Sequence, residues 1–214
     1  HYIICLVRTE APSENRHAGF SQIIVDLKND GAKVRPISNM AGGEDFNEVV
    51  FEDVLVPKDR IVGEPGNGWQ QVTSELAYER SGPERFLSAF RVFVEMVRIC
   101  GDNPSPHQAA AIGRLASHFM TLRRMSISVA GMLEQGKDVG VEAALVKELG
   151  NNFEKVLPEV ARLVVPDLSQ LDPAKHKLFR DTFEETLLLS PSFTLRGGTR
   201  EILRGVIARG LGLR

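Results

Sequence analysis

A glutamate near the middle of the chain stands where a helix is expected to open. Glu79 lies in a segment of helical periodicity, and Pro83 follows four residues later. Proline has no backbone N–H, so Pro83 cannot donate the helical hydrogen bond to the carbonyl of Glu79. The carboxylate would then lie at a kink in an otherwise apolar helix, and partial removal from water makes a carboxylate a stronger base. We therefore treat Glu79 as a candidate general base.

Two arginines near Glu79 support a plainer interpretation. Arg80 follows it directly, and Arg85 lies just beyond Pro83. Either could hold the carboxylate in a surface ion pair, which typically contributes only about 0–1 kcal/mol. The spacing alone leaves both interpretations open.

Residues 195–210 form a second candidate site. Gly197 and Gly198 lead into Thr199, and an amphipathic helix is expected to follow. A glycine pair lets the backbone approach a bulky group closely, and threonine is a favourable N-cap. The free N–H groups of a helix start suit a phosphate or pyrophosphate. The alternative is a terminal helix that only packs on its neighbours.

The composition is that of an ordinary globular protein. The 214 residues are 43% hydrophobic and 25% charged, with a net charge of −2. This charge balance gives no reason to expect nucleic acid or an anionic membrane as a partner. No apolar stretch approaches the roughly 20 residues that a membrane-spanning helix needs. We expect a cytoplasmic protein without membrane insertion.

The cysteines and histidines predict no metal site. Cys5 and Cys100 lie far apart and outside any C-x-x-C spacing, and the histidines show no H-x-x-x-H arrangement. Buried free thiols in a reducing compartment are the expected state of both cysteines.

Residues 1–62 are predicted to form part of an antiparallel β-domain. Short segments rich in Val, Ile and Phe are bounded by Gly, Pro, Asn and Asp. The expected strands are 3–7, 20–27, 33–37 and 48–56. No helical pattern intervenes between them, which favours an antiparallel sandwich or barrel.

Residues 63–214 are predicted to form a helical domain. The expected helices are 69–99, 106–133, 139–165 and 173–189, with a short terminal helix after them. Four long helices joined by short loops predict a four-helix bundle, so the fold class is α+β multidomain. Lys147 and Glu148, on the third of these helices, are expected to form an exposed pair.

Four segments resemble the acyl-CoA dehydrogenase family in their order. They are GAKVRPI at 31–37, FNEVVFEDVLVP at 46–57, VGEPGNGW at 62–69 and GTREILR at 198–204. The resemblance implies that the chain begins partway through the family's middle β-domain and continues to its C-terminal end. The start at His1, within an expected strand, likewise predicts a truncated product.

The family binds FAD and oxidises acyl-CoA thioesters to 2-enoyl-CoA. Most members carry the catalytic glutamate just before the terminal Gly-Thr, where this chain has Gly197. A minority, similar to isovaleryl- and long-chain-type dehydrogenases, carry it in a Leu-x-x-Glu-Arg context, which matches residues 76–80. The resemblance therefore implies that Glu79 is the base that removes the α-proton.

The resemblance also implies roles for neighbouring residues. Gly198, Thr199 and Glu201 are expected to contact FAD, and Arg80 to orient Glu79 or hold the substrate. The implied partners are an acyl-CoA substrate and electron-transfer flavoprotein or a similar acceptor.

Two family motifs that reach across a dimer interface to the neighbouring FAD do not occur here. Residues 98–104 read RICGDNP in place of Arg-x-x-Phe-Gly, and 163–167 read LVVPD in place of Gln-x-x-Gly-Gly-x-Gly. The chain thus resembles a subunit that receives flavin contacts but does not donate them. Such α2β2 enzymes occur in actinobacterial steroid side-chain breakdown. We expect a homo- or hetero-tetramer with a related subunit.

Two other functions stay open at this point. A non-catalytic structural subunit would explain the weak retention of flavin motifs, although Glu79 at the expected kink argues against it. A flavin oxidase-like homologue would share the fold and pass electrons to oxygen.

Overall fold

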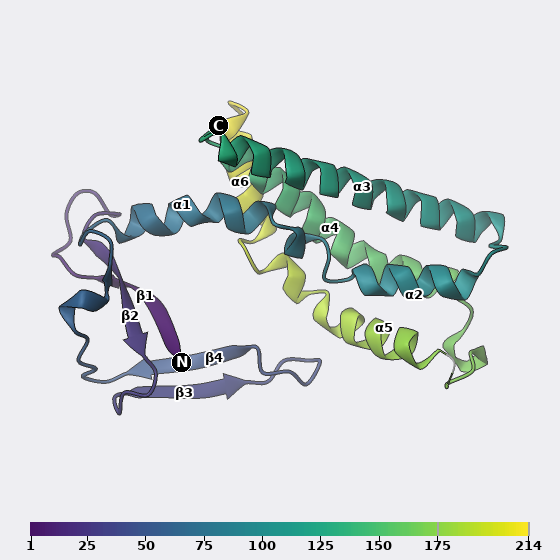
Figure 1. Ribbon diagram of the computed structural model, residues 1–214, viewed down its shortest axis with the longest axis horizontal. Helices are drawn as coiled ribbons and strands as arrows, with labels where there is room; N and C mark the ends of the chain where they lie inside the picture. Colours follow the sequence, from purple (N-terminus) through teal and green to yellow (C-terminus); the bar gives the residue numbers. More distant parts are fainter. Residues whose placement is uncertain (175, 214) are drawn as a thin grey trace. The chain divides into compact units, whose positions relative to one another are not determined.

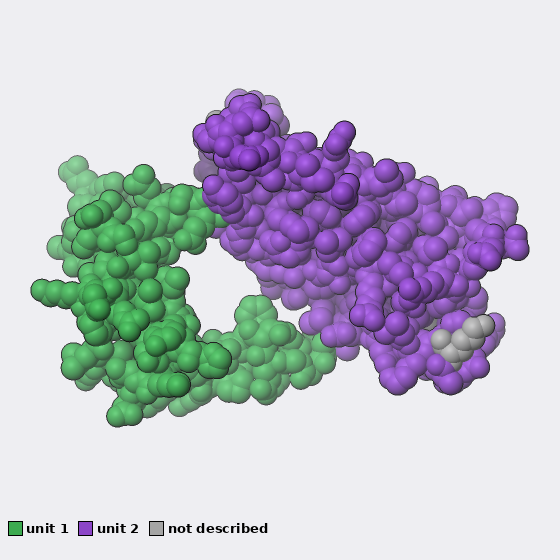
Figure 2. Space-filling view, viewed as in Figure 1, with its two compact units in different colours: residues 1–75 green, residues 76–214 purple. Residues whose placement is uncertain are grey.

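The computed structural model describes residues 1–174 and 176–213, with strands followed by helices (Figure 1). The chain forms two compact units, His1–Glu75 and Leu76–Arg214 (Figure 2). The division falls within the first helix, α1 (Gly68–Ser81). The fold class expected from the sequence is confirmed: a small antiparallel β part precedes a helical bundle.

The first unit contains five short strands. They are β1 (Tyr2–Arg8), β2 (Phe20–Asp26), β3 (Ala32–Ile37), β4 (Phe46–Phe51) and β5 (Ile61–Val62). β1, β2 and β5 form one antiparallel sheet in that order, and β3 pairs with β4 in another. The expected strands are present, but the fourth ends before residue 56, because the chain turns at Asp53 with a φ of 51°.

The second unit contains most of the helices. After α1 come α2 (Phe90–Cys100), α3 (Pro106–Glu134), α4 (Gly140–Val164), α5 (Lys177–Leu189) and α6 (Arg200–Gly210). α2, α3, α4 and α5 pack together as the bundle, and α6 lies along α4 (Figure 1). The core shares buried side chains from all four bundle helices, including Val92, Met96, Leu122, Phe153, Leu157 and Phe183. No helix within the described ranges is long and apolar enough to cross a membrane.

The predicted single helix over 69–99 is wrong, because the chain breaks it into three pieces. α1 ends at Ser81, a 3-10 turn spans Pro83–Arg85, and α2 begins at Phe90. Gly82 has extended backbone angles, as expected before a proline, whose ring disfavours a helical conformation of the preceding residue. The break places Pro83–Arg85 against α4.

Gly150 of α4 permits this close approach. A Cβ at this position would lie 2.4 Å from the carbonyl oxygen of Arg85, far inside van der Waals contact. Because the obstacle is backbone, it cannot move aside as a flexible side chain could. The glycine thus lets the turn that carries Arg85 lie directly on α4.

We expect Gly150→Ala to lower the free energy of unfolding of the helical unit by about 1–3 kcal/mol, the usual cost of overpacking. Gly113→Ala on α3 is the matched control, since nothing lies within 4 Å of its added Cβ. It should stabilise the helix by about 0.5–1 kcal/mol, because alanine loses less backbone entropy than glycine. Urea unfolding followed by circular dichroism measures both. Equal effects of the two substitutions would contradict the close approach.

Candidate functional site

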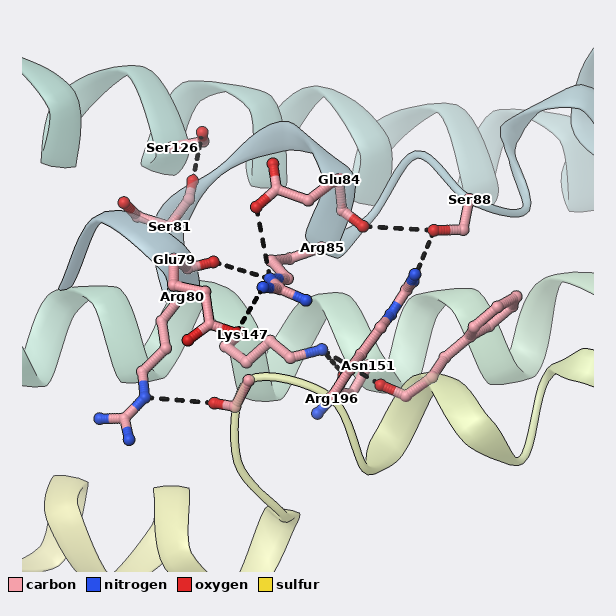
Figure 3. Close-up of polar contacts among 12 residues, drawn as sticks. Glu79, Arg80, Ser81, Glu84, Arg85, Ser88, Ser126, Lys147, Asn151 and Arg196 are labelled. Atoms are coloured by element: carbon pink, nitrogen blue, oxygen red, sulfur yellow. Dashed lines mark hydrogen bonds and ion pairs between the residues drawn. The ribbon is translucent and has the colours of Figure 1, made fainter. Parts of the chain in front are cut away.

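The end of α1 shows how the chain completes a helix that proline interrupts. Pro83 has no N–H to give to the Glu79 carbonyl, and the Arg85 guanidinium supplies the donor instead (Figure 3). Arg85 Nε donates to the Glu79 carbonyl oxygen over 2.7 Å, and Arg85 Nη2 donates to Glu79 Oε1 over 2.8 Å. One side chain therefore fixes both the backbone and the carboxylate of Glu79.

The two partners differ in exposure. The Arg85 side chain is 9% exposed, whereas the Glu79 side chain is 43% exposed. A second carboxylate, that of Glu84, lies 3.4 Å from Arg85 Nε. Of the two pairings that the sequence offered for Glu79, the structure contains the one with Arg85. In this pair the Arg85 guanidinium is buried, whereas part of the Glu79 carboxylate remains accessible to solvent.

Arg80 joins α1 to the terminal glycine turn. Its Nε donates to the carbonyl oxygen of Gly197 over 3.2 Å (Figure 3). Burial lowers the pKa of the Arg80 guanidinium, and the charge of Glu79 opposes that shift. Arg80 Nη2 lies 3.7 Å from the position of a Cβ added to Gly198. The glycine turn therefore lies beside the same helix end that carries Glu79.

A side chain at the position of Gly197 would be crowded. Its φ of +70° lies in the region that favours glycine. A Cβ there would lie 3.1 Å from Lys147 Cε and 3.3 Å from Arg85 Cζ. A side chain at residue 197 would therefore meet the side chains of Lys147 and Arg85. The family resemblance implies position 197 or position 79 as the site of a base. Arg85 binds Glu79, and it lies next to the place that a Cβ at residue 197 would occupy.

A row of buried polar side chains lies on α4 behind this turn. Lys147, Asn151 and Glu154 are each 0% exposed. The prediction of an exposed Lys147–Glu148 pair is wrong: the Glu148 side chain is only 13% exposed, and it binds Arg200 and Arg204 instead. The sequence did hold a signal, since residues 147, 151 and 154 recur at helical spacing among apolar residues.

Lys147 is held by neutral oxygens between two arginines. Its Nζ donates to Asn151 Oδ1 and to the Phe193 carbonyl oxygen, the latter over 3.1 Å. Burial lowers the pKa of Lys147 to about 8, with Arg85 and Arg196 adding to the shift and Glu154 and Glu79 opposing it. The amine therefore titrates close to neutrality inside the protein.

Glu154 neutralises part of this positive charge. Its Oε1 accepts from the backbone N–H of Ser88 over 2.8 Å, and its Oε2 accepts from Arg196 Nη2 over 3.0 Å. Asn151 Nδ2 and Arg196 Nε are buried without a partner among the described residues. Glu154 and Arg196 thus fix the chain before the glycine turn onto α4.

The start of α6 carries the two residues that the family resemblance linked to FAD. Thr199 occupies the N-cap position, but its side chain makes no capping hydrogen bond to the helix. Hydrogen bonds from the Glu201 backbone N–H and from the Thr199 hydroxyl lower the pKa of the Glu201 carboxyl. Arg200 forms two hydrogen bonds to Glu148 Oε1, over 3.1 and 2.9 Å, which anchor α6 to α4.

A cavity of about 380 Å³ lies beside the same end of α1. Tyr78, Ser81 and Pro83 line one side, and Ser126 and Leu133 of α3 line the other. Ser126 Oγ donates to the Ser81 carbonyl oxygen over 2.6 Å, which ties the last turn of α1 to α3. The cavity wall thus includes both neighbours of the Glu79–Arg80 pair in the sequence.

The structure brings together Glu79, Arg80 and the glycine turn, with Thr199 and Glu201 following at the start of α6. Arg85 and Lys147 complete the cluster. The sequence offered Arg85 only as a possible ion-pair partner of Glu79, and it assigned Lys147 no role at this site. Within the described part of the chain, no group of His, Cys, Asp and Glu side chains is placed to hold a metal ion.

No protein-family model matches the chain. Curated relatives do match it. Acyl-CoA dehydrogenase IpdE1 of Mycolicibacterium smegmatis is 29% identical over 97% of the chain and 52% of the relative. The protein of the same name from Mycobacterium tuberculosis is 31% identical over 97% of the chain and 54% of the relative. The chain therefore spans about half the length of these relatives.

Solved structures show the same fold. The ChsE4–ChsE5 complex from Mycobacterium tuberculosis matches with a TM-score of 0.80 and 24% identity. The match covers 100% of this chain and 57% of the matched one. The fold of the chain and the order of its elements therefore recur in a protein of known structure.

The burial of Lys147 predicts a pH dependence of stability. Its pKa is about 8 in the folded protein, against an ordinary value of 10.5. Between these values the unfolded chain binds a proton that the folded protein has lost, so the free energy of unfolding rises with pH. Below pH 8 both states hold the proton and the contribution is constant.

Lys147→Met should remove this rise, which amounts to roughly 1–3 kcal/mol from the pKa difference. Lys155→Met on the exposed side of α4 is the control and should keep it. Urea unfolding at several pH values from 7 to 10 makes the comparison. Parallel profiles for the wild type and Lys147→Met would contradict the buried amine.

Proposed function

Because the chain is related over nearly its whole length to acyl-CoA dehydrogenases, we propose that it is part of an FAD-dependent acyl-CoA dehydrogenase subunit with Glu79 as the base. The observation that carries this proposal is the Glu79 carboxylate at the open end of α1. Arg85 fixes it, and 43% of its side chain remains accessible. A base needs both a fixed position and a side open to its substrate.

The reaction removes two hydrogens from adjacent carbons of an acyl-CoA thioester. Glu79 accepts the α-proton. The electron pair of the broken Cα–H bond forms the new Cα=Cβ double bond as a hydride leaves the β-carbon. FAD, when bound, supplies the acceptor for that hydride. Exclusion of water and polarisation of the thioester carbonyl make the α-proton acidic enough for a carboxylate to take it.

Arg80 is suited to hold the substrate near Glu79. Its Nε is engaged with Gly197, and within the described ranges the two terminal nitrogens make no hydrogen bond. A guanidinium whose outer edge is free offers two parallel donors to an oxygen-rich ligand. We assign it to substrate binding or to the orientation of Glu79.

The start of α6 is suited to an anionic cofactor. Gly198 has a φ of +103°, and no Cβ blocks approach to the backbone there. The Thr199 side chain does not cap the first turn of α6. The N–H donors that the Glu201 carboxylate does not engage, together with the positive end of the helix dipole, suit a pyrophosphate. These features fit the assignment of Gly198, Thr199 and Glu201 as residues that hold FAD.

We propose that the native enzyme is an oligomer with a related subunit. Exposed apolar residues recur every seven positions on two neighbouring helices, a spacing that suits packing against another helix. On α4 they are Leu149, Val156 and Leu163, and on α3 they are Met120 and Ile127. The ChsE4–ChsE5 structure is itself described as a complex. A related partner would supply the two FAD motifs that residues 98–104 and 163–167 lack.

A non-catalytic subunit is the second candidate function. It is favoured by those two altered segments and by the ion pair that Arg85 makes with Glu79. In that case Arg85 would serve only to donate a hydrogen bond to the Glu79 carbonyl at the end of α1. A flavin oxidase-like homologue differs from both in using oxygen, and oxygen consumption with acyl-CoA distinguishes it.

Glu79→Gln should lower the rate of dehydrogenation by about 10²–10⁴-fold, the usual contribution of a positioned base. The amide keeps the volume and most hydrogen bonding, so folding and flavin content should not change. Flavin reduction in the native assembly after mixing with acyl-CoA thioesters, from short chains to a steroid side chain, measures the rate. Glu75→Gln, one turn earlier on α1 and exposed, is the control. A rate within a few-fold of wild type would remove Glu79 from this role.

Val156→Asp should weaken the assembly, because a carboxylate in a buried apolar contact has no partner. Leu188→Asp on α5 is the control, with a side chain of similar exposure, 42% against 41%. Light scattering of the native assembly measures the mass, and the flavin content should fall with it.

In the unmodified assembly, about one FAD per pair of unlike chains is the expected ratio. A homotetramer with one FAD per chain would contradict a heteromeric enzyme.

A further inference from the structure

We infer that Arg85 is a positioning residue that sets the geometry of Glu79 for catalysis. The inference rests on the proposed role of Glu79 as base. It follows from the way a single guanidinium contacts the carbonyl and the carboxylate of the same residue (Figure 3). Arg85 does not meet the substrate in this account and acts only through Glu79.

Two contacts at separate points restrict Glu79 more than an ordinary ion pair does. The 2.7 Å bond to the carbonyl oxygen fixes the backbone at the open end of α1. The 2.8 Å bond to Oε1 then fixes the side chain relative to that backbone. Among the described residues the Glu79 carboxylate is engaged through Oε1, which leaves Oε2 available to accept a proton.

The planar guanidinium is needed for this arrangement. Its Nε and Nη2 donate along fixed directions, so the carbonyl and the carboxylate can both be reached from one side chain. A lysine carries its charge at a single nitrogen on a flexible stem and presents no such fork. Lysine at position 85 would keep the charge and lose one of the two restraints.

The surroundings fix the guanidinium itself. The Arg85 side chain is 9% exposed, and its carbonyl lies against Gly150 of α4. Gly197 brings the terminal turn to its other side, where an added Cβ would lie 3.3 Å from Arg85 Cζ. Arg85 is therefore enclosed between α4 and the glycine turn. A displacement of about 1 Å in a reacting group can cost about 10²-fold in rate, so this enclosure bears on catalysis.

A double-mutant cycle in the native assembly tests the inference. The variants are Arg85→Met, Arg85→Lys, Glu79→Gln and the double variant of Arg85→Met with Glu79→Gln. Arg85→Met should lower kcat about 10–100-fold with KM within about threefold, since the base is misplaced while substrate binding is kept. In the Glu79→Gln background it should cause no further loss, because Arg85 acts through the carboxylate. Arg162→Met, which breaks the exposed pair with Glu159 on α4, is the control and should match wild type.

Either of two results would overturn the inference. One is a kcat for Arg85→Met within about threefold of wild type. The other is an equal loss from Arg85→Met with and without Glu79→Gln, which a merely structural role would give. If Arg85→Met does not fold, Arg85→Lys replaces it in the same double-mutant cycle. A kcat of Arg85→Lys near that of the wild type would then contradict the role given to the two guanidinium donors. A near-normal rate for Glu79→Gln would refute the proposed function itself. A large loss for Glu79→Gln with a normal rate for Arg85→Met would refute only the inference about Arg85.

Discussion

The missing N–H of Pro83 is the constraint on which the site depends. It leaves the Glu79 carbonyl without a helical donor, ends α1 at Ser81 and sends the chain toward α4. A partly buried carbonyl without a partner is costly, and the Arg85 guanidinium removes that cost with a 2.7 Å hydrogen bond. The same side chain reaches the Glu79 carboxylate, so the repair of a broken helix also places a potential base.

The rest of the cluster keeps this repair in place. Gly150 lets the turn with Arg85 lie on α4, and Gly197 lets the terminal turn close over it. Behind them Lys147 and Glu154 are fully buried. Glu154 accepts hydrogen bonds from Ser88, which follows the Arg85 turn, and from Arg196, which precedes the glycine turn. Buried polar groups of this kind are stable only when they are hydrogen-bonded, so they link α4, the Arg85 turn and the terminal turn into one arrangement.

The sequence predicts much of this fold and part of the site. The strands and long helices follow from hydrophobic periodicity, and the opening of the helix at Glu79 follows from Pro83 alone. The sequence pattern does not predict the break into α1 and α2, because residues 86–97 continue the apolar pattern of the first helix. Nothing in the local sequence separates Arg85 from Arg80 as the partner of Glu79, since that choice depends on which side chain α4 buries. The sequence predicts an exposed Lys147 because charged residues usually are exposed. Its burial depends on the Phe193 carbonyl, which is distant in the sequence, and on Asn151.

The central claim is that Glu79 faces the α-carbon of an acyl-CoA while Arg85 holds it. A crystal structure of the native assembly with FAD and an unreactive acyl-CoA analogue measures this directly. The account predicts a Glu79 carboxylate oxygen in contact with the α-carbon, and Arg85 still bonded to the Glu79 carbonyl. An α-carbon that contacts a different base, with Glu79 turned toward solvent, would contradict it.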